Sequence, residues 1–104
     1  MKFVELKSQE MLEELKKEGK YLLYFKTSTC NVCDVMQEKI KEKFEDIDLS
    51  MGLVQIETMP ALRGQYLVFS GPTLLVFDGE KEIHRESRFI ELDRLERVLD
   101  LWLS

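Results

Sequence analysis

The chain has 104 residues and a mass of 12.3 kDa, which is the size of one domain with its own hydrophobic core. Hydrophobic residues make up 44% and charged residues 34%, so disordered, collagen-like and low-complexity classes are excluded. The net charge of −5 argues against a nucleic-acid partner, because nucleic-acid binding requires clustered lysine and arginine.

The first half of the chain alternates strand and helix patterns. Residues 2–6 alternate polar and apolar side chains, which predicts a short edge strand. Residues 9–18 have the pattern of an amphipathic helix, with Ser8 as its N-cap. The apolar run 21–25 predicts a strand covered on both faces, and a second amphipathic helix begins close to Cys30. The apolar positions of that helix are Cys33, Met36, Ile40 and Phe44.

The second half begins with a strand pattern at residues 52–57 and a short, irregular helix pattern at 60–68. Residues 73–77 and 80–88 predict two antiparallel strands. The turn between them is Asp78-Gly79, a pair that tolerates the positive φ of hairpin turns. An apolar stripe at helical spacing then predicts a C-terminal helix, formed by Leu92, Leu95, Val98, Leu99, Trp102 and Leu103.

The expected order of elements is therefore β-α-β-α-β-α-β-β-α, which is typical of an α/β fold. Helices between successive strands imply right-handed crossovers and a largely parallel sheet, with helices on both faces. The terminal hairpin adds an antiparallel edge. No linker or composition change divides the chain, so we expect a single domain over residues 1–104.

Membrane and secretion signals are missing from the sequence. No apolar run approaches the roughly 18 residues of a membrane span. The N-terminus reaches Glu5 without the apolar middle of a signal peptide. The chain has 2 cysteines, far fewer than a secreted disulfide-rich scaffold. We therefore expect a cytoplasmic protein that does not bind a membrane.

Cys30 and Cys33 lie where a buried strand gives way to a helix. The unpaired N–H groups and partial positive charge of a helix N-terminus stabilise a thiolate, so Cys30 should have a lowered pKa. Cys30 is expected to be the more exposed of the two. Cys33 follows one helical turn later, close enough to close and open a disulfide. The pattern predicts that Cys30 attacks a substrate disulfide and that Cys33 resolves the mixed disulfide.

The cysteine pair has three other interpretations. Both cysteines can be inert side chains of the hydrophobic core. Cysteines of that kind need not lie at a strand-to-helix junction, so the position of this pair disfavours the interpretation. A closed zinc site needs four ligands, and the sole histidine, His84, lies far from the cysteines in the sequence. One chain therefore cannot supply the ligands, and the remaining metal interpretation is a site that bridges two chains. A permanent structural disulfide is disfavoured by the expected cytoplasmic setting. A redox role is the favoured interpretation, because the spacing occurs in a β-α-β context.

With these features the sequence resembles the thioredoxin family along nearly its whole length. The resemblance rests on Cys30-x-x-Cys33 after the strand 21–25, on the segment Gly71-Pro72-Thr73-Leu74-Leu75-Val76-Phe77, and on the Asp78-Gly79 turn. It implies a thioredoxin fold with a mixed sheet of about five strands and about four helices. It also implies a cis peptide bond before Pro72, which faces the cysteines, and pairing of an extended substrate with the backbone of Gly71.

Several positions depart from the family pattern. Thr29 stands where the family has tryptophan, and Asn31-Val32 replaces glycine-proline between the cysteines. The family's buried aspartate and its lysine partner are matched by Tyr24 and Leu53. The proton of the resolving thiol would then pass to water or to Glu57. A family glycine near the substrate groove is matched approximately by Arg88, next to Phe89.

The sequence therefore predicts a thiol–disulfide oxidoreductase that reduces protein disulfides and receives electrons from a thioredoxin-reductase-type donor. Cys30 and Cys33 are the expected catalytic pair and redox-active disulfide. Thr29, Gly71 and Pro72 are the expected substrate-binding residues, with Phe69 as an exposed hydrophobic wall of the groove. No metal and no organic cofactor is expected, and the protein is expected to be a monomer. The alternative is a binding module or redox sensor with little turnover.

Overall fold

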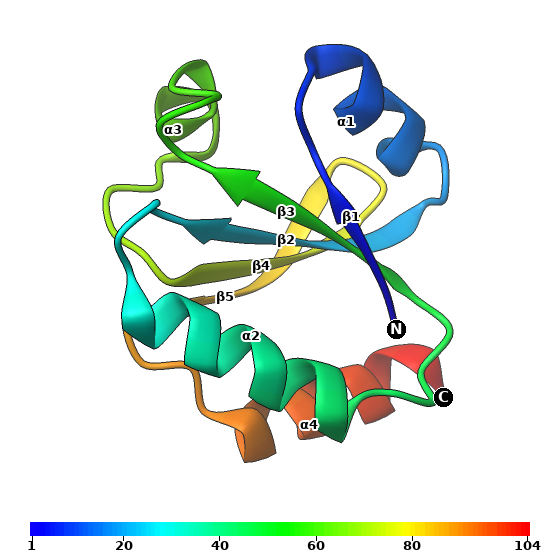
Figure 1. Cartoon of the computed structure of the whole chain (residues 1–104). Helices are drawn as coiled ribbons and strands as arrows, with labels where there is room; N and C mark the ends of the chain where they lie inside the picture. The colour runs from blue at the N-terminus through cyan, green and yellow to red at the C-terminus, as the bar shows by residue number, and fades with distance from the viewer.

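The structure is a computed structural model that describes residues 1–104 and consists of a central five-stranded sheet between two layers of helices (Figure 1). The elements are β1 (Lys2–Glu5), α1 (Gln9–Lys16), β2 (Lys20–Lys26), α2 (Asn31–Lys43), β3 (Ser50–Gln55), α3 (Ala61–Tyr66), β4 (Thr73–Asp78), β5 (Lys81–Ser87) and α4 (Leu92–Leu103). Their order confirms the predicted α/β class. No helix is long and apolar enough to span a membrane.

The strands lie in the order β1-β3-β2-β4-β5, with β3 parallel to β1 and β2, and with β4 antiparallel to β2 and β5. The predicted largely parallel sheet is thus wrong for β4, and the mixed sheet implied by the family resemblance is confirmed. With six residues, α3 is only about 9 Å long, whereas β4, also of six residues, is about 20 Å long. Because α3 cannot carry the chain back along the sheet, β4 starts where β2 ends, with Thr73 opposite Phe25.

The sheet buries an apolar layer on each face. Leu12 of α1 and Leu62 of α3 pack with Phe25 on one face, and Ile40 of α2 and Leu99 of α4 join the cluster on the other. Figure 1 shows α1 and α3 above the sheet and α2 and α4 below it. Residues 21–25 of β2 are all buried, as their unbroken apolar run predicts. The end of this central strand is thereby fixed in position, and the cysteines follow it.

Local signals set most element ends. Ser8 caps α1, its Oγ accepting a hydrogen bond from the Met11 N–H at 3.2 Å. The helix predicted at 60–68 is shorter than expected, because Leu67 adopts a left-handed conformation with φ of 54° and ends it. The last strand begins after the Asp78-Gly79 turn as predicted, where Gly79 has φ of 65°.

Candidate active site

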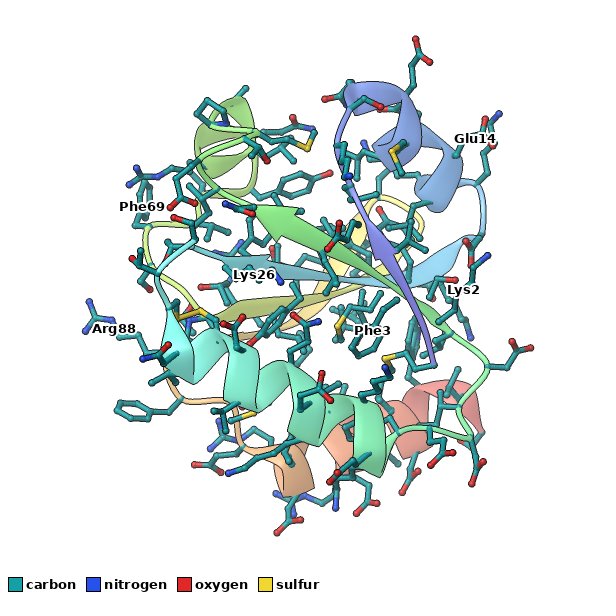
Figure 2. The ribbon with its side chains drawn as sticks, in the orientation of Figure 1. Lys2, Phe3, Glu14, Lys26, Phe69 and Arg88 are labelled. Carbon is teal, nitrogen blue, oxygen red and sulfur yellow. A yellow bond between two sulfur atoms is a disulfide. The ribbon has the colours of Figure 1, made fainter.

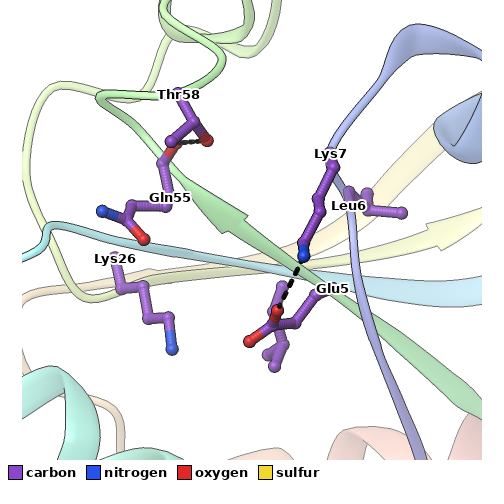
Figure 3. Close-up of a pocket in the computed structure, with 7 residues that line it drawn as sticks. Glu5, Leu6, Lys7, Lys26, Gln55 and Thr58 are labelled. Carbon is purple, nitrogen blue, oxygen red and sulfur yellow. Dashed lines mark hydrogen bonds and ion pairs between the residues drawn. The ribbon is translucent and has the colours of Figure 1, made fainter.

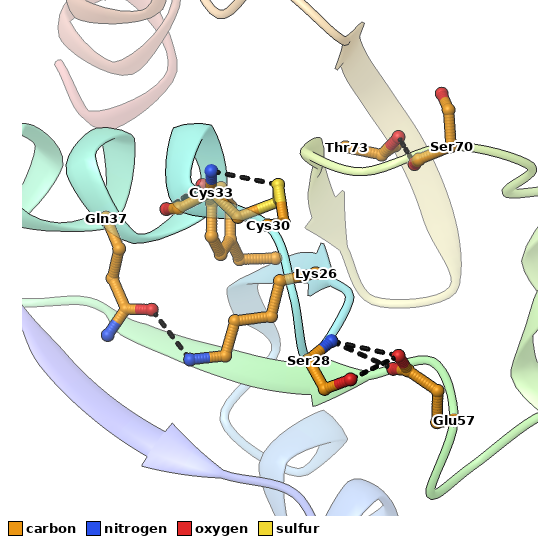
Figure 4. The surroundings of a disulfide bond; sticks show 9 residues. Lys26, Ser28, Cys30, Cys33, Gln37, Glu57, Ser70 and Thr73 are labelled. Carbon is orange, nitrogen blue, oxygen red and sulfur yellow. Dashed lines mark hydrogen bonds between the residues drawn. A yellow bond between two sulfur atoms is a disulfide. The ribbon is translucent and has the colours of Figure 1, made fainter.

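The two cysteines lie at the start of α2, immediately after the short loop that follows β2 (Figure 4). They form a disulfide with the Cα atoms 5.2 Å apart. Cys30 is the N-cap of α2, and its Sγ accepts a hydrogen bond from the Cys33 N–H at 3.0 Å. The first sulfur therefore takes the position of a helix-capping acceptor, where N–H groups and the helix dipole favour negative charge.

The two sulfurs differ in exposure. Cys33 is fully buried, whereas Cys30 is partly exposed. Asn31 and Val32, between them, point into solvent. This difference confirms the expectation that Cys30 is the more accessible cysteine, and it leaves Cys30 as the sulfur that a macromolecular partner can reach.

Gly71 brings a second segment of backbone against the disulfide. Its peptide bond to Pro72 is cis, as the family resemblance implies. A Cβ at Gly71 would lie 3.2 Å from Cys33 Sγ, so a larger residue would crowd the sulfur. The Gly71 N–H and C=O form no hydrogen bond within the chain. Unpaired backbone groups at an accessible position are free to pair with another chain.

The remaining predicted substrate-binding residues flank this point. Thr29 is exposed and directly precedes Cys30. Phe69, two residues before Gly71, leaves 71% of its side chain in solvent. Pro72 is buried, and its carbonyl accepts a hydrogen bond from the Arg88 N–H at 2.7 Å. The fold thus brings Gly71 against the sulfur of Cys33 and joins Arg88 to the same segment through the Pro72 carbonyl.

Tyr24 lies beneath the second cysteine. Its hydroxyl is buried and donates a hydrogen bond to the Cys33 carbonyl at 2.7 Å. Burial raises the pKa of Tyr24 far above neutrality, with the nearby Asp34 adding to the rise. Its partner across the strands is Leu53, which is also buried. These two positions therefore supply a hydrogen-bond donor and an apolar side chain, but no base for the resolving thiol.

Glu57, which was expected with water as an acceptor for the Cys33 proton, is bound to Ser28 in the loop before Cys30. Its carboxylate accepts hydrogen bonds from the Ser28 N–H at 2.9 Å and from the Ser28 hydroxyl at 2.8 Å (Figure 4). The Ser28 backbone and then its hydroxyl lower the pKa of Glu57, which makes its carboxylate a weaker base. The sequence did not signal this link, because the two residues are 29 positions apart. Glu57 thus anchors the loop that leads to Cys30.

A hollow of about 240 Å³ lies beside the site, at the carboxyl ends of β1, β2 and β3 (Figure 3). Lys26, Gln55 and Glu5 are among its lining residues, but neither cysteine is. The ammonium group of Lys26 donates to the Gln37 side chain at 3.0 Å, which ties β2 to α2. The disulfide therefore lies outside this hollow, with Cys33 buried and only Cys30 partly exposed.

A disulfide at the start of a helix, beside a cis-proline segment and on a mixed five-stranded sheet, defines the class of thioredoxin-fold proteins with a Cys-x-x-Cys site. The family model described as Thioredoxin matches residues 2–100, and the chain belongs to the thioredoxin family.

Relatives from several organisms agree with this assignment. The thioredoxin-like protein YdfQ of Bacillus subtilis is 26% identical over 96 residues, covering 90% of this chain and 86% of the relative. The crystal structure of a thioredoxin-like protein from Bacillus cereus is 36% identical and has a TM-score of 0.65, with 91% and 99% of the two chains covered. A mutant thioredoxin from Halobacterium salinarum shares the fold, with a TM-score of 0.88 at 17% identity over 99% and 92%.

Proposed function

We propose that this protein is a thiol–disulfide oxidoreductase that reduces disulfides of other proteins, with Cys30 as nucleophile and Cys33 as resolving thiol. The observation that carries the proposal is the Cys33 N–H donating to Cys30 Sγ at the N-terminus of α2, with the second sulfur buried. The same donor that contacts the disulfide sulfur would stabilise a Cys30 thiolate after reduction. Membership of the thioredoxin family supports the same chemistry.

The reaction would run in two exchanges. The Cys30 thiolate attacks one sulfur of the substrate disulfide, whose other sulfur leaves as a thiolate and takes a proton from water. Cys33 then gives its proton to water, and its sulfur attacks Cys30 Sγ, releasing the second substrate sulfur as a thiolate, which also takes a proton from water. The substrate gains two electrons and two protons, and the protein ends as the Cys30–Cys33 disulfide.

The substrate would approach as an extended chain. The free backbone groups of Gly71 suit pairing with such a chain, and Pro72 holds that backbone beside the sulfurs. Thr29 and Phe69 would contact the substrate on either side. A thioredoxin-reductase-type enzyme would return two electrons to the disulfide. The proposal includes a monomeric protein, since both cysteines of the chain are joined to each other. It also includes a cytoplasmic location, since two cysteines are far fewer than a secreted disulfide-rich scaffold has.

An insulin-disulfide reduction assay with dithiothreitol as electron source tests the proposal. We expect wild type to accelerate precipitation of the insulin B chain and Cys30→Ser to give the uncatalysed rate. Reduced Cys33→Ser, incubated with insulin after removal of dithiothreitol, should accumulate a mixed disulfide through Cys30, visible as a mass increase that added reductant reverses. Equal rates for wild type and Cys30→Ser would refute the enzymatic role.

A redox sensor with slow turnover is the second candidate. It is favoured by Tyr24, whose hydroxyl donates to the Cys33 carbonyl and provides no base for the resolving step. In that case the cysteines would titrate between dithiol and disulfide in a glutathione buffer, but insulin would be reduced no faster than by dithiothreitol alone. Thiol labelling across the buffer series, measured beside the insulin assay, separates the two candidates.

A further inference from the structure

A partly buried lysine without an acidic partner lines the hollow at the carboxyl ends of β1, β2 and β3. Lys26 is the last residue of β2, and the only hydrogen bond of its ammonium group goes to the neutral Gln37 side chain, at 3.0 Å. Every other lysine or arginine of the chain is exposed or forms an ion pair with a carboxylate. Figure 2 shows Lys26 between the sheet and α2, whereas Arg88 projects into solvent.

Strand register places the polar residues of the hollow on one face of the sheet. Lys26 pairs with Gln55 of β3, and Glu5 of β1 pairs with Leu53, two residues before Gln55. Side chains at paired and at alternate strand positions lie on the same face. Leu53 belongs to the apolar cluster that contains Ile40 of α2, so this is the face that α2 covers. Lys26 and Gln55 therefore lie side by side in the hollow, next to α2.

The charges around the hollow do not cancel. Glu5 and Lys7 lie 4.0 Å apart and form an exposed ion pair, and Figure 3 shows this pair apart from the Lys26 ammonium group. Because the charges of Glu5 and Lys7 offset each other, Lys26 leaves the lining with one net positive charge. Partly buried charges in proteins are usually paired with an opposite charge. A bound anion would supply the partner that the chain does not provide.

Free hydrogen-bond donors indicate that the anion carries oxygen atoms. An ammonium group has three N–H donors, of which Lys26 uses one on Gln37. The side-chain amide of Gln55 makes no hydrogen bond within the chain, whereas the Thr58 hydroxyl already donates to the Gln55 carbonyl at 2.9 Å. A carboxylate accepts several hydrogen bonds and carries the single negative charge that offsets that of Lys26.

We propose that the hollow is a binding site for a small organic carboxylate, whose oxygens accept hydrogen bonds from Lys26 and Gln55. Its volume of about 240 Å³ is below the roughly 300–1,000 Å³ of sites for drug-sized ligands, so the ligand has only a few carbon atoms. The apolar residues of the lining are Leu6 and Leu53, which suit a short aliphatic chain beside the carboxylate.

The carboxylate site lies next to the disulfide and does not contain it. A Cβ at Gly71 would lie 3.5 Å from Lys26 Cα and 3.2 Å from Cys33 Sγ, so the two sites are separated by little more than one residue. Neither cysteine lines the hollow. The binding therefore requires no thiol chemistry, goes beyond the proposed function and does not depend on it.

Titration of the oxidised protein with butyrate tests the proposal. At pH 7 and constant ionic strength, proton–nitrogen correlation spectra report the shifts of the backbone amides. We expect the shifts to concentrate around Lys26 and Gln55, with a dissociation constant of about 1 mM for so small a ligand. Butyramide has the same shape without the charge and should bind about tenfold more weakly. Inorganic phosphate binding more tightly than butyrate would overturn the assignment of the ligand as a carboxylate.

Lys26→Met should weaken butyrate binding about tenfold, because it removes the ammonium group and keeps the length of the side chain. Lys26→Arg keeps the charge and should retain binding. Lys81→Met is the matched control, since Lys81 is exposed on β5 at the opposite edge of the sheet. Wild-type affinity in Lys26→Met would overturn the site. An equal loss in Lys26→Met and Lys81→Met would do so too, because it would show that only the overall charge attracts the ion.

Glu5→Gln provides a second variant whose effect has the opposite sign. It removes the carboxylate that offsets Lys7, so both lysines can attract the ligand, and butyrate should bind more tightly than to wild type. Weaker butyrate binding by Glu5→Gln would contradict the proposal, even if Lys26→Met did not fold.

Discussion

At the scale of single residues, Tyr24 shapes the environment of the buried cysteine. Its hydroxyl donates to the Cys33 carbonyl at 2.7 Å, and burial raises its pKa well above neutrality, so the hydroxyl stays protonated. Tyr24 therefore stabilises the first turn of α2 and takes no proton from the resolving thiol. This buried hydrogen bond should therefore contribute measurably to the free energy of unfolding.

Tyr24→Phe should lower the free energy of unfolding of the oxidised protein by about 1 kcal/mol, because the buried hydrogen bond is lost. Tyr66→Phe is the matched control: its hydroxyl is buried without a hydrogen-bond partner, so its removal should be neutral or stabilising. Urea denaturation monitored by circular dichroism measures both. An equal effect of the two substitutions would show that the Tyr24 hydrogen bond adds nothing.

At the scale of elements, the junction between β2 and α2 depends on a link to the end of β3. Ser28 lies in the loop before Cys30, and Glu57 follows β3 and accepts both of its hydrogen bonds. Folding lowers the pKa of Glu57 from its ordinary value of 4.5. The contribution of Glu57 to stability is therefore present above that value and is lost as the pH falls through the folded-state pKa.

Glu57→Gln should consequently be less stable than wild type at pH 7, and the difference should shrink as the pH falls below about 4. Midpoints of urea denaturation across this pH range provide the measurement. Glu38→Gln serves as control, because Glu38 is exposed on α2 and forms no hydrogen bond or ion pair. A Glu57→Gln deficit that stays constant with pH would rule out the carboxylate as its source.

At the scale of the whole molecule, Gly52 of β3 lies where the covering layer leaves no room for a side chain. A Cβ there would lie 2.7 Å from side-chain atoms of both Leu6, which follows β1, and Leu15 of α1. Protein interiors are packed densely enough that one added methyl group displaces its neighbours. Gly52 thus sets how closely α1 covers the sheet.

Gly52→Ala should destabilise the protein by about 1–3 kcal/mol through overpacking. Gly64→Ala provides the opposite case, since no atom lies within 4 Å of its added Cβ and the residue is in α3. There we expect a gain of about 0.5 kcal/mol from the reduced freedom of the unfolded chain. Thermal unfolding measures both variants, and a Gly52→Ala protein as stable as wild type would contradict the packing argument.

Much of the fold was predictable because its signals are local. Apolar runs and periodicity located most of the nine elements, Ser8 identified the start of α1, and the Asp78-Gly79 turn located the returning strand. Cys30 and Cys33 were placed at a strand-to-helix junction from their spacing and the apolar run before them. The direction of β4 was not predictable by the same means, because it depends on how little of the sheet α3 can span.

The sequence by itself determined the elements, the cysteine pair and the family, since periodicity, capping and short motifs act between residues close in the chain. Only the tertiary structure decided what surrounds the sulfurs: Glu57 on Ser28, Gly71 against Cys33, and Arg85 on the loop at Leu67. These contacts join residues 18 to 38 positions apart, and no side chain indicates its distant partner. The reason is physical: such contacts form only when packing of the two cores brings strand ends together.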